Sequence, residues 1–512
     1  MPTLYIEGRW RSSASGRTRE ITCPADRQVV ATVDEADATD AEAAVAAART
    51  AFDRGGWPQT PTPERAAVVR RVADLLEAEL EDVARLESLD TGKRMAESRI
   101  DMQDIIGVFR HFADLAQSEA GRVVDTGMPG VSSRVVHEPV GVCSLITPWN
   151  FPLLQTSWKV APALAAGNTF VLKPSELTPQ TAIWLLGALE RAGLPAGVGN
   201  LVTGAGADVG PTLTSHPDVD LVSFTGGVVT GRTIMAAAAP TVKRVALELG
   251  GKNPNVVFAD ADLEAAVDNA LTAIFLDSGQ VCSAGARLIV EESVHDEVVD
   301  ELVRRAGRIR MGGPFDERAE TGPLISDAHR DKVAAYVDAA RAEGAVVRCG
   351  GEIPGGELEG GCYYPPTILD GCRTQMACVQ EESFGPVLTV ETFSGADRDG
   401  AEDAAVALAN DTIYGLAGAV WTQDAGRAER VAGRLRHGTI WINDYHPYVP
   451  QAEWGGMKQS GIGRELGVVG LHEYLETKHI WHNTRPAVAD WFDRGAPQDA
   501  APAAHDTPEE QV

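Results

Sequence analysis

The sequence predicts an α/β protein with two doubly wound domains and a small β extension, and three observations lead to this fold class. Its 512 residues exceed what one hydrophobic core usually organises, so we expect more than one domain. Residues 36–120 carry apolar side chains at three- and four-residue spacing, which predicts helices. From residue 141 onward, short β-rich runs alternate with turns and helical stretches, which favours parallel sheets with crossover helices.

The first sheet is expected within residues 141–251, where five apolar runs each end in a turn: GVCSLITP, NTFVLKPS, GNLVTG, DLVSFTGG and RVALELGG. A doubly wound sheet of this kind binds nucleotides at the carboxyl ends of its strands. We therefore expect residues 1–120 and 141–250 to form a Rossmann-like nucleotide-binding domain. Residues 251–453 repeat the alternation and are expected to form a second α/β domain, with the active site in the cleft between the two.

Two shorter segments and the chain end complete the predicted layout. Residues 121–140 and 466–485, the latter containing KHIWHN, are expected to pair as a β extension used for oligomerisation. Residues 486–512 are rich in Ala, Pro, Asp and Glu, which predicts a disordered acidic tail.

Composition and charge exclude several classes of function. A formal net charge of −28 repels phosphate backbones and anionic lipid, so we expect neither a nucleic-acid nor a membrane partner. The seven cysteines form no C-x-x-C pair, which predicts reduced thiols and no metal site. The start MPTLYIEGRW lacks a basic stretch followed by an apolar one, so a cytoplasmic location is expected.

Three residues suit chemistry at a carbonyl carbon. Cys282 in GQVCSAG has small neighbours, which suits a nucleophile, and a helix beginning here would lower the thiol pKa; a packed core cysteine is an equal alternative. Asn150, on the turn after an apolar strand, can donate a hydrogen bond to an oxyanion. Glu248 ends a strand beside two glycines and can activate water, although a lone Glu is more often a surface charge.

Two further segments suit a dinucleotide. In KPSE, Lys173 and Glu176 follow a strand, where they can bind ribose hydroxyls and the carboxylate repels a 2′-phosphate; a solvated turn is the alternative. The segment LVSFTGGVVTGR runs strand, glycines, helix, the order that places a pyrophosphate at a helix N-terminus. Because it is not a true G-x-G-x-x-G, this segment alone is a weak signal.

Taken together, PWNFP, KPSE, FTGG, LELGGKNP, GQVC, EESFGPV and WGGMKQSGIGRELG resemble the aldehyde dehydrogenase superfamily in order and spacing, over residues 5–483. The resemblance implies NAD as the cofactor, Cys282 as the nucleophile that forms a thioester, Glu248 as the general base and Asn150 in the oxyanion hole. It also implies a proton relay through Lys159 and Glu465. The implied cofactor-binding residues are Ile146, Thr147, Pro148, Trp149, Lys173, Ser175, Glu176, Gly206, Phe224, Gly226, Gly227, Thr230, Leu249, Glu382 and Phe384.

The sequence departs from the superfamily pattern at two positions. Gly227 replaces a usual Ser, which removes a hydroxyl but leaves the amide. Asp277 replaces a common Asn five residues before the nucleophile, and its carboxylate is expected to raise the thiol pKa.

Within the superfamily the segments TPWNFPLLQTSWKVAPALAAGN and WINDYHPYVPQAEWGGMKQSGIGRELG are most similar to betaine-aldehyde dehydrogenases. This resemblance implies that Phe151, Trp158 and Trp454 bind a trimethylammonium group by cation–π interaction; plain packing is the alternative. Leu276 replaces an aromatic residue and Glu453 a Pro, so ω-aminoaldehydes or a broad range of aldehydes are an alternative substrate class.

The expected activity is therefore oxidation of betaine aldehyde to glycine betaine, by a homodimer or homotetramer. A binding or structural protein on the same scaffold is disfavoured because Cys282, Glu248 and Asn150 occur together. An acylating enzyme that releases acyl-CoA is disfavoured because the base matching Glu248 serves hydrolysis.

Overall fold

The computed structural model describes residues 2–486 and 491–492. Residues 2–119 and 138–476 form one compact unit, and residues 120–137 with the described residues from 477 onward form another. Of the predicted tail, only residues 486, 491 and 492 are described, so that prediction lies outside the described residues. Within the described ranges, no helix has the length and apolar character needed to span a membrane.

The first large sheet has eight strands in the order β19-β11-β10-β7-β8-β9-β1-β2. Its five central strands are parallel: β7 (Val142–Ile146), β8 (Thr169–Lys173), β9 (Gly199–Leu201), β10 (Leu221–Gly226) and β11 (Arg244–Leu249). The three strands outside this parallel set are antiparallel to their neighbours: β1 (Leu4–Ile6), β2 (Arg9–Arg11) and β19 (Gly461–Ile462). The strand order reverses between β7 and β10, where a doubly wound sheet binds its ligand.

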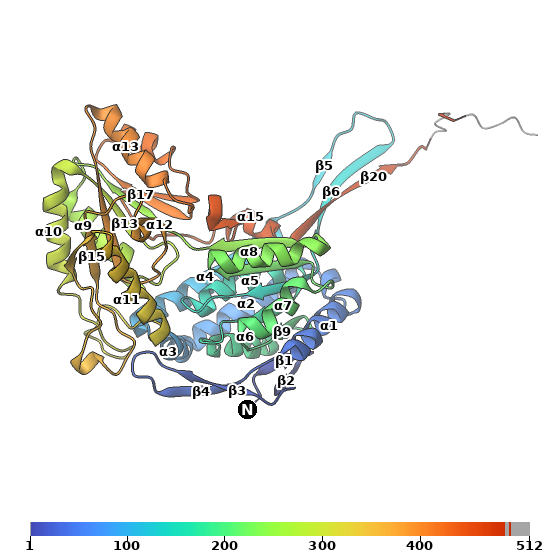
Figure 1. Cartoon of the computed structure of the whole chain (residues 1–512). Helices are drawn as coiled ribbons and strands as arrows, with labels where there is room; N and C mark the ends of the chain where they lie inside the picture. Colours follow the sequence, from blue (N-terminus) through green and yellow to red (C-terminus); the bar gives the residue numbers. More distant parts are fainter. Residues whose placement is uncertain (1, 487–490, 493–512) are drawn as a thin grey trace, which may run out of the picture. The chain divides into compact units, whose positions relative to one another are not determined.

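Helices cover both faces of this sheet (Figure 1). Leu145 and Leu172 point into a core shared with α2, α4, α5 and α6. Their sequence neighbours Ile146 and Val171 point into a second core, shared with α1, α7 and α8. Because successive strand residues face opposite sides, the arrangement is doubly wound, as predicted. The helices are α1 (Ala38–Arg54), α2 (Thr62–Ala78), α3 (Leu80–Thr91), α4 (Met95–Ser118), α5 (Pro152–Ala166), α6 (Gln180–Arg191), α7 (Gly206–Ser215) and α8 (Val228–Ala238).

Local sequence explains where several of these helices begin and end. The Asp37 side chain accepts hydrogen bonds from the amides of Thr39 and Asp40, which caps α1. Helix α5 begins with Pro152, whose missing N–H costs nothing in the first turn. It ends at Gly167, whose φ of +99° favours glycine.

The second large sheet has seven strands in the order β14-β15-β16-β13-β12-β17-β18. All are parallel except the edge strand β14. The strands are β12 (Pro254–Val257), β13 (Arg287–Glu291), β14 (Val346–Cys349), β15 (Thr367–Asp370), β16 (Val387–Phe393), β17 (Ala417–Trp421) and β18 (Thr439–Ile442). Leu288 packs with α9 and α10, whereas Ile289 packs with α13 and α14, so helices cover both faces here as well.

The helices that follow β12 are α9 (Leu263–Phe275), α10 (His295–Ala306), α11 (Asp327–Ala342), α12 (Ala377–Gln380), α13 (Arg398–Asn410), α14 (Ala425–Ala432) and α15 (Gly467–His472). The 3₁₀ turns are η1 (Trp57–Gln59), η2 (Ala239–Thr241), η3 (Leu276–Gly279), η4 (Glu292–Val294), η5 (Gly356–Leu358) and η6 (Lys458–Ser460). A two-stranded sheet pairs β3 (Thr18–Thr22) with β4 (Val29–Asp34).

The remaining sheet has three strands, in the order β20-β6-β5. It joins β5 (Arg122–Val124), β6 (Val131–Pro139) and β20 (Leu475–Asn483). The two segments expected to form a β extension therefore do pair, although they are far apart in sequence.

Candidate active site

A cavity of about 250 Å³ brings together residues at the carboxyl ends of strands in the first large sheet and residues that precede β13 and β16 in the second. Eleven of the residues predicted from sequence line it: Pro148, Trp149, Asn150, Gly226, Gly227, Glu248, Leu249, Cys282, Glu382, Phe384 and Trp454. Pro148 to Asn150 follow β7, Gly226 ends β10, and Leu249 ends β11. The predicted nucleophile, amide donor and base therefore share one cavity.

Cys282 lies in a turn after η3, so the helix suggested at this position is wrong. Asp277 and Ser278 adopt left-handed conformations, with φ of +46° and +56°, which end the helical path before the nucleophile. Asn150 Nδ2 donates a hydrogen bond of 2.7 Å to the carbonyl of Gln280, which holds the amide beside the Cys282 loop.

The thiol is not activated by its surroundings in the free protein. Burial, followed by the carboxylates of Glu248 and Glu382, raises the pKa of the Cys282 thiol to about 12. Among the charged groups, Glu248 and Glu382 have the largest influence on the thiol pKa. The Asp277 carboxylate interacts with Lys93 and with Glu97, Asp101 and Glu87.

Glu248 sits near the end of β11 with its carboxyl group buried. Burial and the neighbouring Glu465 raise the pKa of Glu248 well above its usual value. A Cβ at Gly455 would lie 2.7 Å from Glu248 Oε1, and the φ of +152° at Gly455 also favours glycine. The glycine in WGG thus leaves space for the carboxyl group, and Glu248 is a buried acid rather than a surface charge.

Behind Glu248 lies the predicted relay pair. Lys159 Nζ is 2.5 Å from Glu465 Oε1 and 3.0 Å from Ser223 Oγ, and all three side chains are buried. The second oxygen of Glu465 has no hydrogen-bond partner among the described residues. The Lys159 charge lowers the pKa of Glu248 while Glu465 raises it, so both groups act electrostatically on the predicted base.

The edge formed by β7, β10 and β11 suits the pyrophosphate and nicotinamide ends of NAD. Helix α8 begins after Gly227 without a side-chain cap, and a Cβ at Gly227 would meet only open space. The buried hydroxyl of Thr225 has no partner among the described residues and also lines the cavity. Uncapped amides, an unpartnered hydroxyl and an open glycine together fit an anionic group at this helix start.

Glu382 and Phe384 close the other side of the cavity. Glu382 Oε1 accepts a 2.9 Å hydrogen bond from the amide of Gly251, and burial raises the pKa of Glu382 to about 7. A Cβ at Gly250 would lie 2.1 Å from Glu382 Oε2, so the strand end approaches this carboxyl group closely. The residues present fit NAD.

The other predicted cofactor residues surround this edge without lining the cavity. Lys173 ends β8, and its Nζ lies 3.4 Å from Glu176 Oε2. Burial lowers the pKa of Lys173. Ile146, Phe224 and Thr147 are buried in or after their strands; Ser175 lies in the turn after β8, Gly206 begins α7 and Thr230 is exposed on α8.

Sequence reasoning missed five residues that line the cavity: Gln155, Thr225, Gly250, His329 and Lys332. His329 Nε2 lies 2.7 Å from the carbonyl of Phe384, and its ring is 5.4 Å from that of Trp149. Burial lowers the pKa of His329 to about 4, so the imidazole is neutral at pH 7. The three-residue spacing of His329 and Lys332 could have indicated that both side chains point the same way, because residues three apart share a helix face.

Three aromatic rings form a compact cluster at the Trp454 side. Ring centroids lie 5.4 Å apart for Trp158 and Tyr448, 5.9 Å for Trp158 and Trp454, and 6.0 Å for Tyr448 and Trp454. Tyr445 packs further out, 4.7 Å from Trp441. These distances are typical of packed aromatic pairs, and Trp454 brings the cluster to the cavity wall.

Phe151 and Glu453 lie outside this aromatic cluster and contact other groups. The Lys93 ammonium lies 3.9 Å from the centroid of Phe151. The Glu453 carboxylate accepts a 3.3 Å hydrogen bond from the amide of Val469, at the start of α15. Neither side chain lines the cavity, so Glu453 is occupied as a helix-terminal group.

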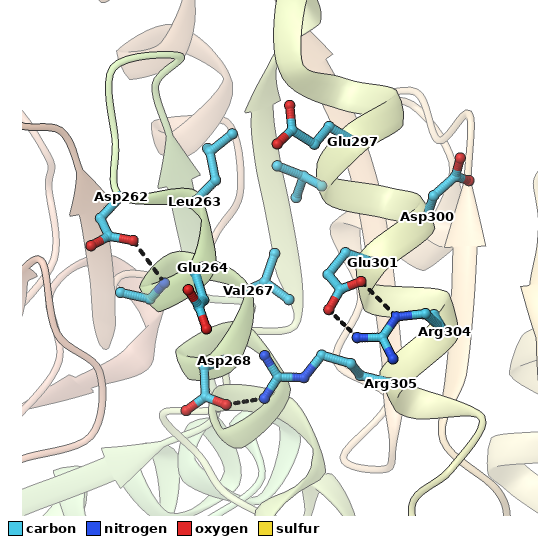
Figure 2. Close-up of a pocket in the computed structure, with 12 residues that line it drawn as sticks. Asp262, Leu263, Glu264, Val267, Asp268, Glu297, Asp300, Glu301, Arg304 and Arg305 are labelled. Carbon is cyan, nitrogen blue, oxygen red and sulfur yellow. Dashed lines mark hydrogen bonds and ion pairs between the residues drawn. The ribbon is translucent and has the colours of Figure 1, made fainter.

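A larger cavity of about 910 Å³ lies elsewhere, between α9 and α10. Figure 2 shows that its walls carry carboxylates, and two of these pair with arginines, as Asp268 with Arg305 and Glu301 with Arg304. It contains no nucleophile, and its volume does not make it the better candidate.

Comparison with known proteins identifies the family. Residues 10–480 match the aldehyde dehydrogenase family. The chain is 55% identical over 491 residues to betaine aldehyde dehydrogenase of Bacillus subtilis (strain 168), covering 96% of this chain and 99% of that protein. It is 42% identical over 495 residues to the peroxisomal aminoaldehyde dehydrogenase 2 of Pisum sativum, covering 96% and 97%.

Solved structures agree with this assignment. A 1.90 Å crystal structure of betaine aldehyde dehydrogenase from Staphylococcus aureus in complex with NAD⁺ is 51% identical, with a TM-score of 0.94 and 96% of each chain covered. With the thiol, the buried carboxyl group and the amide donor in one cavity, this chain belongs to the aldehyde dehydrogenase family.

Proposed function

We propose that the protein oxidises betaine aldehyde to glycine betaine with NAD, through a thioester on Cys282. The observation that carries this proposal is the single cavity lined by Cys282, Asn150, Glu248 and Trp454. The relatives named betaine aldehyde dehydrogenase support the substrate, and the solved relative in complex with NAD⁺ supports the cofactor.

The first half of the reaction forms the thioester. Cys282 Sγ attacks the aldehyde carbon, and the Asn150 amide stabilises the oxyanion that develops. Because burial raises the pKa of Cys282 to about 12, the thiol first loses its proton to water, and Sγ then attacks as the thiolate. When bound, NAD supplies the acceptor for the hydride that leaves the aldehyde carbon.

The second half hydrolyses the thioester. Glu248 takes a proton from the attacking water, and its raised pKa makes it a stronger base than an exposed carboxylate. The Glu465 carboxylate, whose second oxygen has no partner among the described residues, then receives that proton from Glu248, while the Lys159 ammonium offsets the charge of the two acids. Cys282 therefore acts in both thioester formation and hydrolysis, whereas Lys159 and Glu465 act only in hydrolysis.

An ω-aminoaldehyde is the second candidate substrate, because a carboxylate lies behind the aromatic cluster. Tyr448, whose ring is 5.4 Å from Trp158, donates a 2.9 Å hydrogen bond to Asp104 Oδ2. A partly buried carboxylate favours a cation of any kind, whereas the rings favour a weakly hydrated one. The relatives named aminoaldehyde dehydrogenase support this alternative.

The test is the absorbance of NADH with betaine aldehyde, an ω-aminoaldehyde and a short neutral aldehyde. We expect the highest kcat/KM with betaine aldehyde and no turnover for Cys282→Ala, which should still bind NAD. Equal kcat/KM for all three aldehydes would contradict the substrate, and turnover by Cys282→Ala would contradict the mechanism. Coenzyme A should not accelerate the reaction or yield acyl-CoA.

We further propose a division of labour along the chain. Residues 1–120 and 141–250 bind NAD, and residues 251–453 carry the thiol. The sheet β20-β6-β5 serves association into a homodimer or homotetramer, because β20 and β5 are edge strands and a strand of another chain can pair with such an edge. Light scattering should give a mass of two or four chains, and a monomer would contradict this assignment. A cytoplasmic location stays a prediction, testable by cell fractionation.

A further inference from the structure

Lys93 is a fully buried lysine next to the active site that the mechanism above does not use. It lies between α3 and α4, and its side chain has 0% exposure. Its Nζ lies 2.7 Å from Asp101 Oδ2 and 3.9 Å from the centre of the Phe151 ring. One ammonium thus binds a carboxylate from α4 and the face of an aromatic ring just before α5.

Several buried carboxylates surround this one ammonium. Glu87 on α3, Glu97 and Asp101 on α4, and Asp277 on η3 are all buried. Arg94 pairs with Glu97 at 3.1 Å, which leaves Lys93 to balance the other three. Asp104, one turn along α4, is hydrogen-bonded to Tyr448.

Burial and mutual repulsion make these carboxylates costly to ionise. The pKa of Glu87 is raised to about 7, and the pKa values of Asp101 and Asp277 are raised as well, in each case chiefly by burial. The Lys93 charge lowers the pKa of all three. Without it, the region would hold three buried acids and no cation to offset them.

Two of these residues, Glu87 and Asp277, link the surroundings of Lys93 to the segments on either side of Asn150. Glu87 Oε1 accepts a 3.4 Å hydrogen bond from the amide of Leu153, in the first turn of α5 after Asn150. On the other side, the Asp277 carbonyl accepts two 3.1 Å hydrogen bonds from the amide and side chain of Gln280. The Gln280 carbonyl in turn accepts from Asn150 Nδ2.

We propose that Lys93 is a positioning residue for the reaction. Its ammonium holds the Phe151 ring and the Asp277 end of the loop 277–282 in place, and this determines the position of the Asn150 amide relative to Cys282. It touches neither cofactor nor reacting atoms. This inference rests on the proposed function only for the kinetic readout, since the electrostatic readout needs no aldehyde.

The experiment compares wild type with Lys93→Met, Lys93→Met/Asp101→Asn and the control Lys243→Met, a partly buried lysine outside the site. For Lys93→Met we expect kcat to fall about tenfold or more by the same factor for betaine aldehyde and a neutral aldehyde. We expect Cys282 to be alkylated by iodoacetamide at a changed rate. Lys243→Met should match wild type in both assays.

The pH dependence of stability separates a charge role from simple packing. In Lys93→Met the carboxylates lose their cation, so their pKa values rise further and more stability is lost as the pH increases. We expect Tm to fall by roughly 5 °C more at about pH 9 than at about pH 6, relative to wild type. Removing one carboxylate in Lys93→Met/Asp101→Asn should restore part of the Tm at the higher pH.

Three results would overturn the proposal. These are a kcat for Lys93→Met within about twofold of wild type, a loss confined to the cationic aldehyde, or a Tm loss that is the same at both pH values. If Lys93→Met does not fold, Asp277→Asn decides: it removes one buried acid and should raise Tm more at the higher pH, and no such rise would contradict the inference. Wild-type inactivity toward betaine aldehyde would overturn the proposed substrate alone.

Discussion

Two aromatic groups lie beside the nucleophile, and they differ in what already occupies them. The face of Phe151 holds the Lys93 ammonium at 3.9 Å. Trp158, Tyr448 and Trp454 contact one another edge to face, and among the described residues no Lys or Arg lies over them. Because a ring face binds one cation at short range, the face of Phe151 that contacts Lys93 is already occupied, and the second group is the better candidate to bind a substrate cation.

This difference divides the three residues that sequence reasoning grouped as one substrate site. Phe151 contacts the Lys93 ammonium and does not line the cavity, whereas Trp454 lines it together with Cys282. An aromatic residue next to an active site is therefore not by itself evidence for cation binding. The contacts on its face decide the role.

The largest expected effect is at Trp454. Replacing it with Ala should raise KM for betaine aldehyde about tenfold or more, because a desolvated cation over an indole face is stabilised by about 2 kcal/mol. KM for a neutral aldehyde should change much less. Steady-state kinetics with both substrates measure the contrast, and equal losses would mean that the indole only packs the wall.

Phe151→Leu provides the matched comparison. Its ring already faces an internal cation, so kcat/KM should fall by the same factor for betaine aldehyde and for a neutral aldehyde. A loss selective for betaine aldehyde would return Phe151 to the substrate site and remove the distinction between the two groups.

A smaller effect is expected at the cofactor end. Glu176 should disfavour NADP by about 1 kcal/mol or more, or roughly fivefold in kcat/KM, because its carboxylate repels a 2′-phosphate. Glu176→Gln should narrow the ratio between the two cofactors without changing the preference among aldehydes. If wild type used both cofactors equally well, this role for Glu176 would be wrong.

The smallest effect is expected at Glu453. Its carboxylate contacts the amide of Val469 at the start of α15, so Glu453→Ala should lower Tm by only about 1 °C and leave KM for cationic aldehydes unchanged. A selective rise in that KM would place the carboxylate at the substrate, and an aminoaldehyde would become the better candidate.

The site residues that lie at strand ends could be predicted from sequence. Each of them belongs to a local pattern in which an apolar run is followed by a turn. Asn150, Glu248 and Gly226 follow or end strands that the pattern indicates, and the parallel order brings them to one edge. Site residues on other elements could not be predicted in this way. Lys93 has no neighbour in sequence that predicts its contact with Phe151, and His329 lies on a helix without a motif.

The conformation of the Cys282 loop could not be predicted either. Small residues around the thiol are compatible with a helix start or a turn, and the left-handed φ values at Asp277 and Ser278 decide for the turn. The charge that lowers the pKa of Asp277 belongs to Lys93, which is distant in sequence. Both features follow from tertiary packing rather than from local preference.

The most direct test of the central claim is mass spectrometry of Glu248→Gln quenched after mixing with NAD and betaine aldehyde. The substitution removes the base for hydrolysis, so the acyl group should accumulate as a thioester on the peptide that contains Cys282, together with a burst of NADH. An unmodified Cys282 peptide, or a burst lost as fully as steady turnover, would contradict the account.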